Sequence, residues 1–256
     1  MGGRNSRSFV EQRRERLVSI LAERGRASVV ELAERLEASP ITIRRDLSEL
    51  EERGVLMRRY GEAVLLPCDG TASTEACRQA IARAAAELVS DDELVFINTS
   101  STALALIPHL RASGVSVVTN SVLAQNLPAP PGGTLFVTGG EIRPPRGVLS
   151  GDFALANVRR VSAATCFVGC AGISLTAGVT STTQQEAEVN SLMVNRSDRM
   201  VLLADSSKLG IGAGFTYAPL SRVALLITDA GATDEDVSIL REAGVHEVMR
   251  VGSAAR

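Results

Sequence analysis

The chain has 256 residues, of which 45% are hydrophobic, and its formal net charge is −2 at pH 7. This hydrophobic fraction can build a core, so disorder throughout the chain is excluded, and the length suits one large domain or two smaller ones. Four cysteines without a Cys-x-x-Cys pattern and only two histidines argue against a zinc site, and we expect no metal and no cofactor. With no signal peptide and no apolar run of about 18 residues, we expect a cytoplasmic protein with no membrane partner.

The charge is distributed unevenly along the chain. Residues 1–66 carry 13 arginines against 11 acidic residues, whereas residues 67–256 carry 14 basic against 18 acidic residues. Five arginines and two glutamates fall in the first 16 positions, which predicts a basic arm over residues 1–8. A local positive potential of this kind is typical of a small nucleic-acid-binding module attached to an acidic partner domain.

Two helices are predicted at the start of the chain. The apolar positions within 10–24 lie on one face of a helix. Ser28 followed three positions later by Glu31 forms a capping box, which predicts that a second helix begins here and runs to Leu36. A short turn over 37–39 then leads to a third helix.

The third helix has the pattern of a DNA-recognition helix. Ser39 is a favourable N-cap, and Pro40 takes the first helical position, where its missing N–H is not needed. An apolar stripe at i, i+4 and i+7 must face a core, and it consists of Ile43, Leu47 and Leu50. Arginine and hydroxyl groups can bind phosphates or base edges, so the residues expected to face DNA are Ser39, Ile41, Thr42, Arg44, Arg45 and Ser48. An ordinary solvated amphipathic helix is the alternative.

A β-hairpin is predicted directly after this helix. Gly54 ends the helix, and two apolar runs within 55–66 flank the turn-forming sequence Tyr60-Gly61-Glu62. Two helices joined by a short turn and followed by a hairpin make a winged helix-turn-helix, with the hairpin as the wing. Arg58 and Arg59 would lie on the wing and bind phosphates, although they would equally serve solubility.

Residues 67–74 contain Pro, Asp, Gly, Ser and Thr and are predicted to link a DNA-binding domain, residues 1–66, to a larger domain, residues 75–256. In the larger domain short apolar runs alternate with helical patterns, which indicates an α/β fold with a mainly parallel sheet covered by helices. The predicted helices are 75–88, 102–111, 152–159, 184–196 and 234–242. The predicted strands are 94–97, 115–118, 135–137, 166–169, 200–204, 224–228 and 247–251.

Small polar residues follow several of the predicted strands. Because the carboxyl ends of parallel strands share one edge of a sheet, these residues are expected to form a ligand site there. Hydroxyls and free N–H groups at helix N-termini suit a phosphate, and Lys208, the one lysine of the chain, could meet the same anion. The residues concerned are Asn98, Ser100, Ser101, Thr102, Thr119, Asn120, Ser121, Gly140, Gly172 and Lys208. For each separate loop, the alternative is that its polar side chains only cap a helix. No catalytic nucleophile–base pair stands out, so an enzyme is not expected.

The motif Ser39-x-x-Thr42-Ile43-Arg44-Arg45-Asp46-Leu47 resembles the DNA-binding domain of the DeoR family of bacterial transcriptional regulators. The resemblance spans residues 16–66 and is also carried by Arg16, Leu17, Leu21, Leu32, Ala33, Leu50, Gly54 and residues 58–63. It implies that Thr42, Arg44 and Arg45 contact operator DNA. Asp46 points sideways on a helical wheel and is expected to orient an arginine rather than meet phosphate. At 60–63 the chain has Tyr-Gly-Glu-Ala, where the family usually has His-Gly-Gly-Ala.

A series of short motifs in the larger domain is similar, in the same order, to the DeoR-type sensor domain. They include 117–121, 167–173, 178–180 and 205–208. This resemblance implies a fold similar to that of ribose-5-phosphate isomerase and a phosphorylated sugar or related metabolite that changes operator affinity. It also assigns Glu186 to the effector site.

Three positions depart from the family pattern. Asn98 and Ser100 stand where the family usually has Asp and Gly in an Asp-x-Gly-Thr-Thr loop, and Asn190 stands where Lys is common. An amide at position 98 can still bond a sugar hydroxyl but cannot act as a base. A side chain at position 100 narrows the phosphate loop.

These observations predict a repressor of a carbohydrate-metabolism operon that binds double-stranded operator DNA and is released or tuned by a phosphorylated sugar. Two alternatives stay open: an isomerase-like sugar-phosphate enzyme with an accessory DNA-binding module, and a DNA-binding protein with a ligand-blind sensor. A homo-oligomer, a dimer or tetramer, is expected because one short recognition helix buries too little surface for operator specificity.

Overall fold

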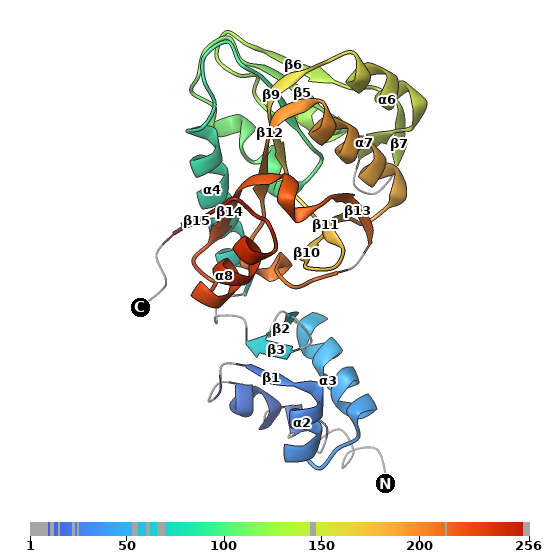
Figure 1. Cartoon of the computed structure of the whole chain (residues 1–256), viewed down its shortest axis with the longest axis vertical. Coiled ribbons are helices and arrows are strands. Elements are labelled where there is room, and N and C mark those ends of the chain that lie inside the picture. Colours follow the sequence, from blue (N-terminus) through green and yellow to red (C-terminus); the bar gives the residue numbers. More distant parts are fainter. Residues whose placement is uncertain are drawn as a thin grey trace. The chain divides into compact units, whose positions relative to one another are not determined.

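The computed structural model describes residues 10, 13–14, 16–21, 24, 26–52, 56–59, 62–65, 70–143, 147–212 and 214–252. Its contacts divide the chain into two compact units, Met1–Ser73 and Thr74–Arg256 (Figure 1). The predicted basic arm, the helix end at Gly54 and the wing turn at Tyr60-Gly61 lie outside the described residues, as do residues 67–69 of the predicted linker.

The N-terminal unit combines helices with a three-stranded antiparallel sheet. The described residues between 10 and 24 are helical, and α2 (Val29–Arg35) and α3 (Pro40–Glu52) follow as predicted. The capping box of α2 is confirmed, because Glu31 N donates to Ser28 Oγ at 3.2 Å and Ser28 N donates to Glu31 Oε2 at 3.4 Å. The predicted hairpin is also confirmed and consists of β2 (Leu56–Arg59) and β3 (Glu62–Leu65). A third strand, β1 (Arg26–Ser28), pairs with β3 and was not predicted.

A seven-stranded, wholly parallel sheet forms the centre of the C-terminal unit, as the α/β prediction requires. Its order is β15-β14-β12-β9-β4-β5-β6. The strands are β4 (Leu94–Ile97), β5 (Ser116–Thr119), β6 (Thr134–Val137), β9 (Ala163–Val168), β12 (Ser197–Leu203), β14 (Val223–Asp229) and β15 (Glu247–Val251). Strands β5 and β6 follow one another on one side of β4, and β9 then pairs with the other side of β4. The order therefore reverses between β4 and β9, and ligands of open α/β sheets bind at such a point.

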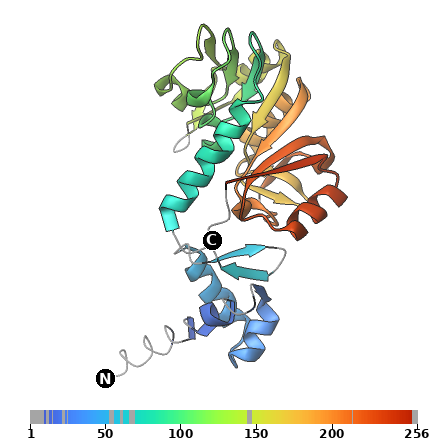
Figure 2. The same ribbon diagram turned by 90° about the vertical axis from the view of Figure 1, so that its left-hand side faces the viewer.

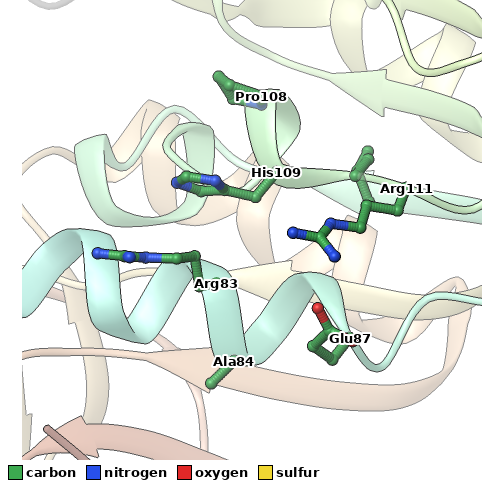
Figure 3. A pocket seen from close by; sticks show the side chains of 7 residues that line it. Arg83, Ala84, Glu87, Pro108, His109 and Arg111 are labelled. Carbon is green, nitrogen blue, oxygen red and sulfur yellow. The ribbon is translucent and has the colours of Figure 1, made fainter.

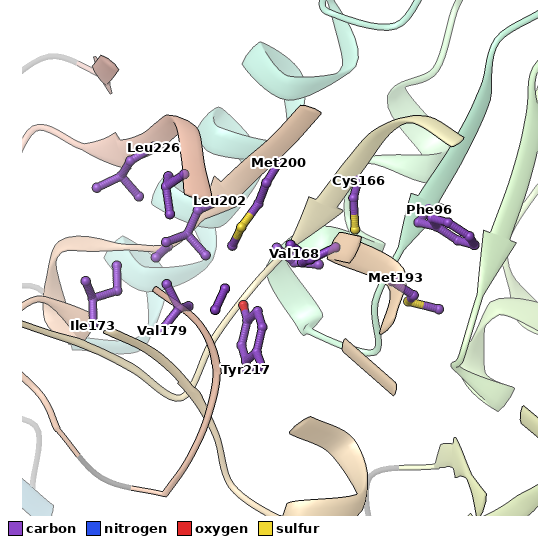
Figure 4. Close-up of a cluster of buried hydrophobic side chains, with 14 of the residues drawn as sticks. Phe96, Cys166, Val168, Ile173, Val179, Met193, Met200, Leu202, Tyr217 and Leu226 are labelled. Carbon is purple, nitrogen blue, oxygen red and sulfur yellow. The ribbon is translucent and has the colours of Figure 1, made fainter. Parts of the chain in front are cut away.

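Both faces of this sheet are covered, which explains the continuous apolar runs in its strands. One core packs α4 (Gly70–Ala86) and α5 (Ser101–Leu104) on the sheet, and α4 runs along this face in Figure 2. The opposite core packs α6 (Gly151–Arg159), α7 (Gln184–Asn195) and α8 (Asp234–Glu242) with strand residues such as Phe96 and Cys166 (Figure 4). Successive residues of a strand alternate between the two cores, as in Val95, Phe96 and Ile97 of β4.

Several predicted boundaries differ from the structure; β9 and β12, for example, each begin three residues before the predicted strand. Two further differences have a clear physical reason. The helix predicted over 102–111 divides into α5 and a 3-10 helix, η1 (Ile107–His109). Pro108 explains the break, because it has no N–H for the carbonyl of Leu104 and its ring would clash with that carbonyl. The second difference concerns the helix predicted to start at residue 75, since α4 begins at Gly70 and includes residues 70–74. No proline falls between residue 70 and the predicted helix start, so the chain can continue the helix toward its N-terminus.

Five strands outside the parallel sheet were not predicted. They are β7 (Glu141–Arg143) and β8 (Val148–Ser150), which pair with each other, and β10 (Gly172–Ser174), β11 (Gly178–Ser181) and β13 (Phe215–Ala218), which form a small antiparallel sheet. Short 3-10 helices, η2 (Val122–Asn126), η3 (Ser206–Lys208) and η4 (Leu220–Arg222), complete the unit.

Candidate DNA-binding face and effector site

The orientation of α3 is fixed by its buried stripe. Ile43, Leu47 and Leu50 are buried in the core of the N-terminal unit, as predicted, against residues that include Leu17 and Leu32. At the start of the helix, Thr42 N donates to Ser39 Oγ at 3.2 Å, which confirms Ser39 as the N-cap. The hydroxyl oxygens of Ser39 and Thr42 lie 2.8 Å apart and share a hydrogen bond. The cap therefore also orients the hydroxyl of Thr42.

Asp46 ties α3 to the first helix. Its side chain is buried, with 2% of its surface exposed. Arg13 Nε donates to Asp46 Oδ2 at 2.5 Å, and Arg14 Nε donates to Asp46 Oδ1 at 3.1 Å. Asp46 thus binds arginines, as predicted, but they belong to the first helix and not to α3. One carboxylate is thus shared by two of the arginines that make the N-terminal sequence basic, and it offsets one of their two positive charges.

The residues predicted to face DNA lie mainly on the open surface of the unit. Ser39, Ile41, Arg44 and Arg45 are exposed, and Thr42 and Ser48 are half-buried. Within the described part of the chain, neither Arg44 nor Arg45 has an ion-pair partner. The backbones of Arg58 and Arg59 lie on β2, and their side chains are outside the described set.

The structure places most residues of the predicted effector site at one edge of the parallel sheet. Asn98 follows β4. Thr119 is the last residue of β5, and Asn120 and Ser121 follow it. Gly140 follows β6, and Lys208 lies in η3 after β12. These are carboxyl ends of neighbouring parallel strands, so they share an edge. Thr138 N donates to Thr119 O at 2.9 Å and links the loops after β5 and β6.

Asn98, directly after β4, bonds the residue directly after β9, at the point where the strand order reverses. Its Nδ2 donates to Gly169 O at 3.0 Å, and its Oδ1 accepts from Gly169 N at 3.0 Å. Oδ1 also accepts from Ser100 N at 3.3 Å. The amide has 1% of its surface exposed, and both of its polar atoms are satisfied within the protein.

Ser100 fills the space in front of Gly169. A Cβ atom at position 169 would lie 1.9 Å from the Ser100 hydroxyl oxygen, which is far inside van der Waals contact. Only glycine at 169 is compatible with this position of Ser100. The two departures from the family pattern, Asn98 and Ser100, therefore meet at one backbone position across the switch point.

The loop after β5 is tied to its neighbours and also carries an unsatisfied polar atom. Thr99 Oγ1 donates to Asn120 O at 2.9 Å and lies 3.0 Å from Asn120 Oδ1. Asn120 O also accepts from Leu149 N at 2.8 Å. Among the described residues, the buried polar atoms without a hydrogen-bond partner include Asn120 Nδ2, Ser150 Oγ at the end of β8, and Asn190 Oδ1 on α7.

Tyr217 joins the same backbone position from the small sheet. Its hydroxyl donates to Gly169 O at 2.9 Å. Burial raises the pKa of Tyr217 well above its ordinary value, and Cys170, Cys166 and Glu186 raise it further. The hydroxyl therefore remains a donor at physiological pH.

Lys208 and Glu186 lie around this centre. Burial raises the pKa of Cys170 to about 12, while the charge of Lys208 lowers it and that of Asp205 raises it. Lys208 therefore acts electrostatically on the residue next to Gly169. Glu186 is buried in the first turn of α7, and Asn190, one turn later, donates through Nδ2 to Ser181 Oγ at 2.9 Å.

Gly140 and Gly172 have packing roles in the structure. Gly140 has φ +112°, and a Cβ there would lie 2.4 Å from Ser150 O. Gly172 belongs to β10, and a Cβ there would lie 2.4 Å from Ile211 O. Ser101 is exposed, Thr102 is buried, and Ser121 is the N-cap of η2.

Two surface pockets lie elsewhere on the C-terminal unit. One, of about 340 Å³, is lined by Arg83 of α4, by Glu87 just after that helix, and by His109 and Arg111 across from them (Figure 3). The other, of about 500 Å³, lies between the 175–178 turn and β13. Neither is lined by a residue of the predicted effector site.

Sequence reasoning missed Gly169, Thr99 and Tyr217 as organising residues of the sheet edge. Gly169 and Thr99 stood inside motifs that were recognised, but their partners are 71 and 21 residues away in the sequence. Tyr217 gave no signal, since its strand was not predicted. Among the described residues, no group of three His, Cys, Asp or Glu side chains could hold a metal ion, and no helix is long and apolar enough to cross a membrane.

A winged helix-turn-helix with an open Arg/Thr face, joined to a parallel α/β unit with a polar switch point, defines a DNA-binding transcriptional regulator. Two family models match the chain: the DeoR-like helix-turn-helix domain over residues 13–67 and the DeoR C-terminal sensor domain over residues 73–230. The chain belongs to the DeoR family, whose members are regulators and not enzymes.

Curated relatives span nearly the whole chain. The HTH-type transcriptional regulator GolR of Listeria innocua is 30% identical, covering 86% of this chain and 91% of that protein. The HTH-type transcriptional repressor GlcR of Bacillus subtilis is 30% identical, covering 86% and 89%. The glycerol-3-phosphate regulon repressor of Escherichia coli K12 is 28% identical, covering 86% and 90%.

Solved structures give a more distant likeness. Ribose 5-phosphate isomerase A of Methanocaldococcus jannaschii is 17% identical and has a TM-score of 0.37, covering 53% of this chain and 55% of that chain. Similarity at this level carries no argument about function.

Proposed function

We propose that this regulator represses a carbohydrate-metabolism operon and that a phosphorylated sugar or related metabolite tunes its affinity for operator DNA. The observation that carries the proposal is the pairing, in one chain, of a helix with exposed arginines and a sheet edge with buried polar atoms that have no hydrogen-bond partner among the described residues. The names of the relatives support the choice of ligand class, since one is a glycerol-3-phosphate regulon repressor.

The proposed DNA contacts come from the exposed side of α3 and from the wing. The arginines would bind phosphates or guanine edges, and the hydroxyls would bind phosphates or bases. The first turn of α3 contains no acidic residue, so a phosphate can approach its N-terminus without repulsion. The residues are Ser39, Ile41, Thr42, Arg44, Arg45, Ser48, Arg58 and Arg59.

In this proposal residues 1–66 bind DNA, residues 67–74 connect, and residues 75–256 sense the effector, all in the cytoplasm where the operator is. The active species is a dimer or tetramer of identical chains, because two recognition helices are needed to read two half-sites. Effector and operator are coupled because the ligand binds differently to two arrangements of the subunits or domains.

The proposed effector is polyhydroxylated because of the buried polar atoms at the sheet edge. Asn120 Nδ2, Ser150 Oγ and Asn190 Oδ1 offer one amide donor, one hydroxyl and one amide acceptor that have no partner among the residues the structure describes. A buried polar group that lacks a partner costs about 1–3 kcal/mol, so a ligand with several hydroxyls would recover that energy. Lys208 supplies the positive charge for a phosphate.

A second candidate, a DNA-binding protein whose sensor does not bind ligand, is favoured by one observation. Both polar atoms of the Asn98 side chain form hydrogen bonds with Gly169, and Ser100 fills the adjacent space. A ligand that enters at the switch point would have to break these contacts or bind beside them.

One experiment separates the two candidates. Operator affinity is measured with DNA from upstream of the protein's own gene, across a panel of phosphorylated sugars, together with the thermal stability of the full chain. We expect at least one compound to change both quantities, and Asn190→Leu, which removes the unsatisfied Oδ1 together with the bond from Nδ2 to Ser181 Oγ, to abolish the response while operator binding without ligand persists. A panel in which no compound changes either quantity would support the ligand-blind sensor.

A further inference from the structure

Ile41 is a large apolar side chain in a position where the fold does not use it. It has 76% of its surface exposed, more than any other large hydrophobic residue described in the N-terminal unit. It lies in the first turn of α3, whereas the core is contacted by Ile43 and Leu47 on the opposite side of the helix.

The requirements of the helix do not explain this residue either. Isoleucine is a weaker helix former than alanine or glutamate, and the first turn of a helix favours acidic residues. The helices α2, α6, α7 and α8 each have an acidic residue in the first turn, and α3 has none. Like α3, α4 and α5 have no acidic residue in the first turn, so position 41 departs from the pattern of α2, α6, α7 and α8.

The surroundings of Ile41 are those of a base-reading side chain. Positions 41, 45 and 48 are spaced i, i+4 and i+7, which places Ile41 on the same face as Arg45 and Ser48. This face is held outward because Ile43 and Leu47 are buried and because Arg13 and Arg14 anchor Asp46. The N-terminal residues of a recognition helix are the ones that reach base edges in the major groove.

We propose that Ile41 contacts the 5-methyl group of a thymine in each operator half-site and thereby fixes the base at that position. The inference rests on the proposed DNA contacts of α3. Thymine alone among the four bases presents a methyl group in the major groove, and apolar side chains recognise it by contact. A cytosine there would present its N4 amine, and isoleucine has no acceptor for that donor.

The test uses operators in which single thymines are replaced by deoxyuridine, which removes the methyl group and leaves base pairing intact. The operator is first delimited by footprinting DNA from upstream of the protein's own gene. At one thymine in each half-site, we expect the full-length protein to bind roughly fourfold more weakly for each methyl group removed. Ile41→Ala should lose about the same affinity on thymine DNA and lose nothing more on the deoxyuridine operator, and Ile41→Val should keep part of the discrimination.

Val30→Ala is the matched control, because Val30 is also an exposed β-branched residue, with 62% of its surface exposed, but lies on α2. This variant should keep the full effect of deoxyuridine. Thermal unfolding of Ile41→Ala should match that of the unaltered protein, since the side chain is outside the core.

Two results would overturn the inference: indifference of the unaltered protein to every deoxyuridine substitution, or an undiminished deoxyuridine effect in Ile41→Ala. Arg45→Ala separates this failure from failure of the proposed DNA contacts. If Arg45→Ala weakens binding while deoxyuridine has no effect, only the role of Ile41 is wrong. If Arg45→Ala and Ile41→Ala both leave affinity and its salt dependence unchanged, α3 is not the DNA-reading helix.

Discussion

The recognition helix and the sheet edge both concentrate polar side chains, but the protein treats them in opposite ways. Arg44 and Arg45 are exposed and, among the described residues, have no ion-pair partner. Asn98 is buried, and both of its amide atoms bond Gly169. Side chains of the first kind are free to bind a partner, whereas those of the second kind hold the fold together. The difference teaches that polarity at a predicted site does not by itself make a residue available to a ligand.

The largest effect is expected at Asp46. Like Asn98 it is buried and its polar atoms are bonded within the protein, yet it belongs to the same helix as the exposed Arg44 and Arg45. Asp46→Ala leaves Arg13 and Arg14 without their buried partner, and the side chains of these arginines are only 16% and 13% exposed. Removing one member of a buried ion pair is strongly destabilising, and we expect a loss of about 3 kcal/mol in the stability of the N-terminal unit. Amide hydrogen exchange of α3 in the full chain measures this loss, with α7 as an internal reference.

Glu49→Ala is the matched control for Asp46→Ala. Glu49 Oε1 lies 3.9 Å from Arg14 Nη1, and its side chain is 42% exposed. An exposed ion pair is worth less than about 1 kcal/mol, so this variant should change the exchange of α3 little. Equal effects of the two substitutions would show that the burial of Asp46 does not govern the stability of the unit.

Gly169 tests the comparison at the sheet edge, where polar side chains hold the fold together. In Gly169→Ala the new methyl group would lie 1.9 Å from the Ser100 hydroxyl oxygen. Overpacking of this kind costs about 1–3 kcal/mol, and we expect a loss of that size in the stability of the C-terminal unit, measured by hydrogen exchange of β4 and β9.

The rescue by Ser100→Gly makes the Gly169 prediction specific. This second substitution removes the side chain that the new methyl group would meet, so the double variant should regain most of the lost stability. A Gly169→Ala protein as stable as the unaltered one, or a loss that Ser100→Gly does not relieve, would show that the two residues do not meet at the switch point.

The contacts of Gly169 also show the limit of what could be predicted from the sequence. The capping box of Ser28 and Glu31, the N-cap Ser39 and the stripe of Ile43 and Leu47 depend on residues within one or two helical turns, so local spacing was sufficient to place them. The bond between Asn98 and Gly169 joins positions 71 residues apart, and the bond between Arg13 and Asp46 joins positions 33 residues apart. Such partners are known only when the fold has brought the segments together.

Strand prediction failed for the same physical reason. The strands of the parallel sheet carry apolar residues for two cores, and this composition is visible in the sequence. The strand β1 has three residues, and β10 and β13 have three and four. These strands exist because antiparallel partners satisfy their backbone groups, which leaves little trace in their own residues.

Arg45 gives the smallest expected change in stability and the clearest contrast in function. Because the side chain is exposed and has no ion-pair partner among the described residues, Arg45→Ala should alter the stability of the N-terminal unit by less than about 0.5 kcal/mol. Operator binding should nevertheless weaken by about 1–3 kcal/mol if the arginine reads a base, or show mainly a smaller slope of affinity against salt concentration if it holds a phosphate.

Arg35→Ala controls for the loss of one positive charge, because Arg35 is exposed and lies in the last turn of α2. Affinity titrations at several salt concentrations, paired with hydrogen exchange of α3, measure both quantities on the same proteins. A destabilisation above about 1 kcal/mol in Arg45→Ala would mean that the fold depends on this arginine. The recognition helix would then resemble the sheet edge, and the distinction between free and committed polar side chains would fail at the residue where it should hold best.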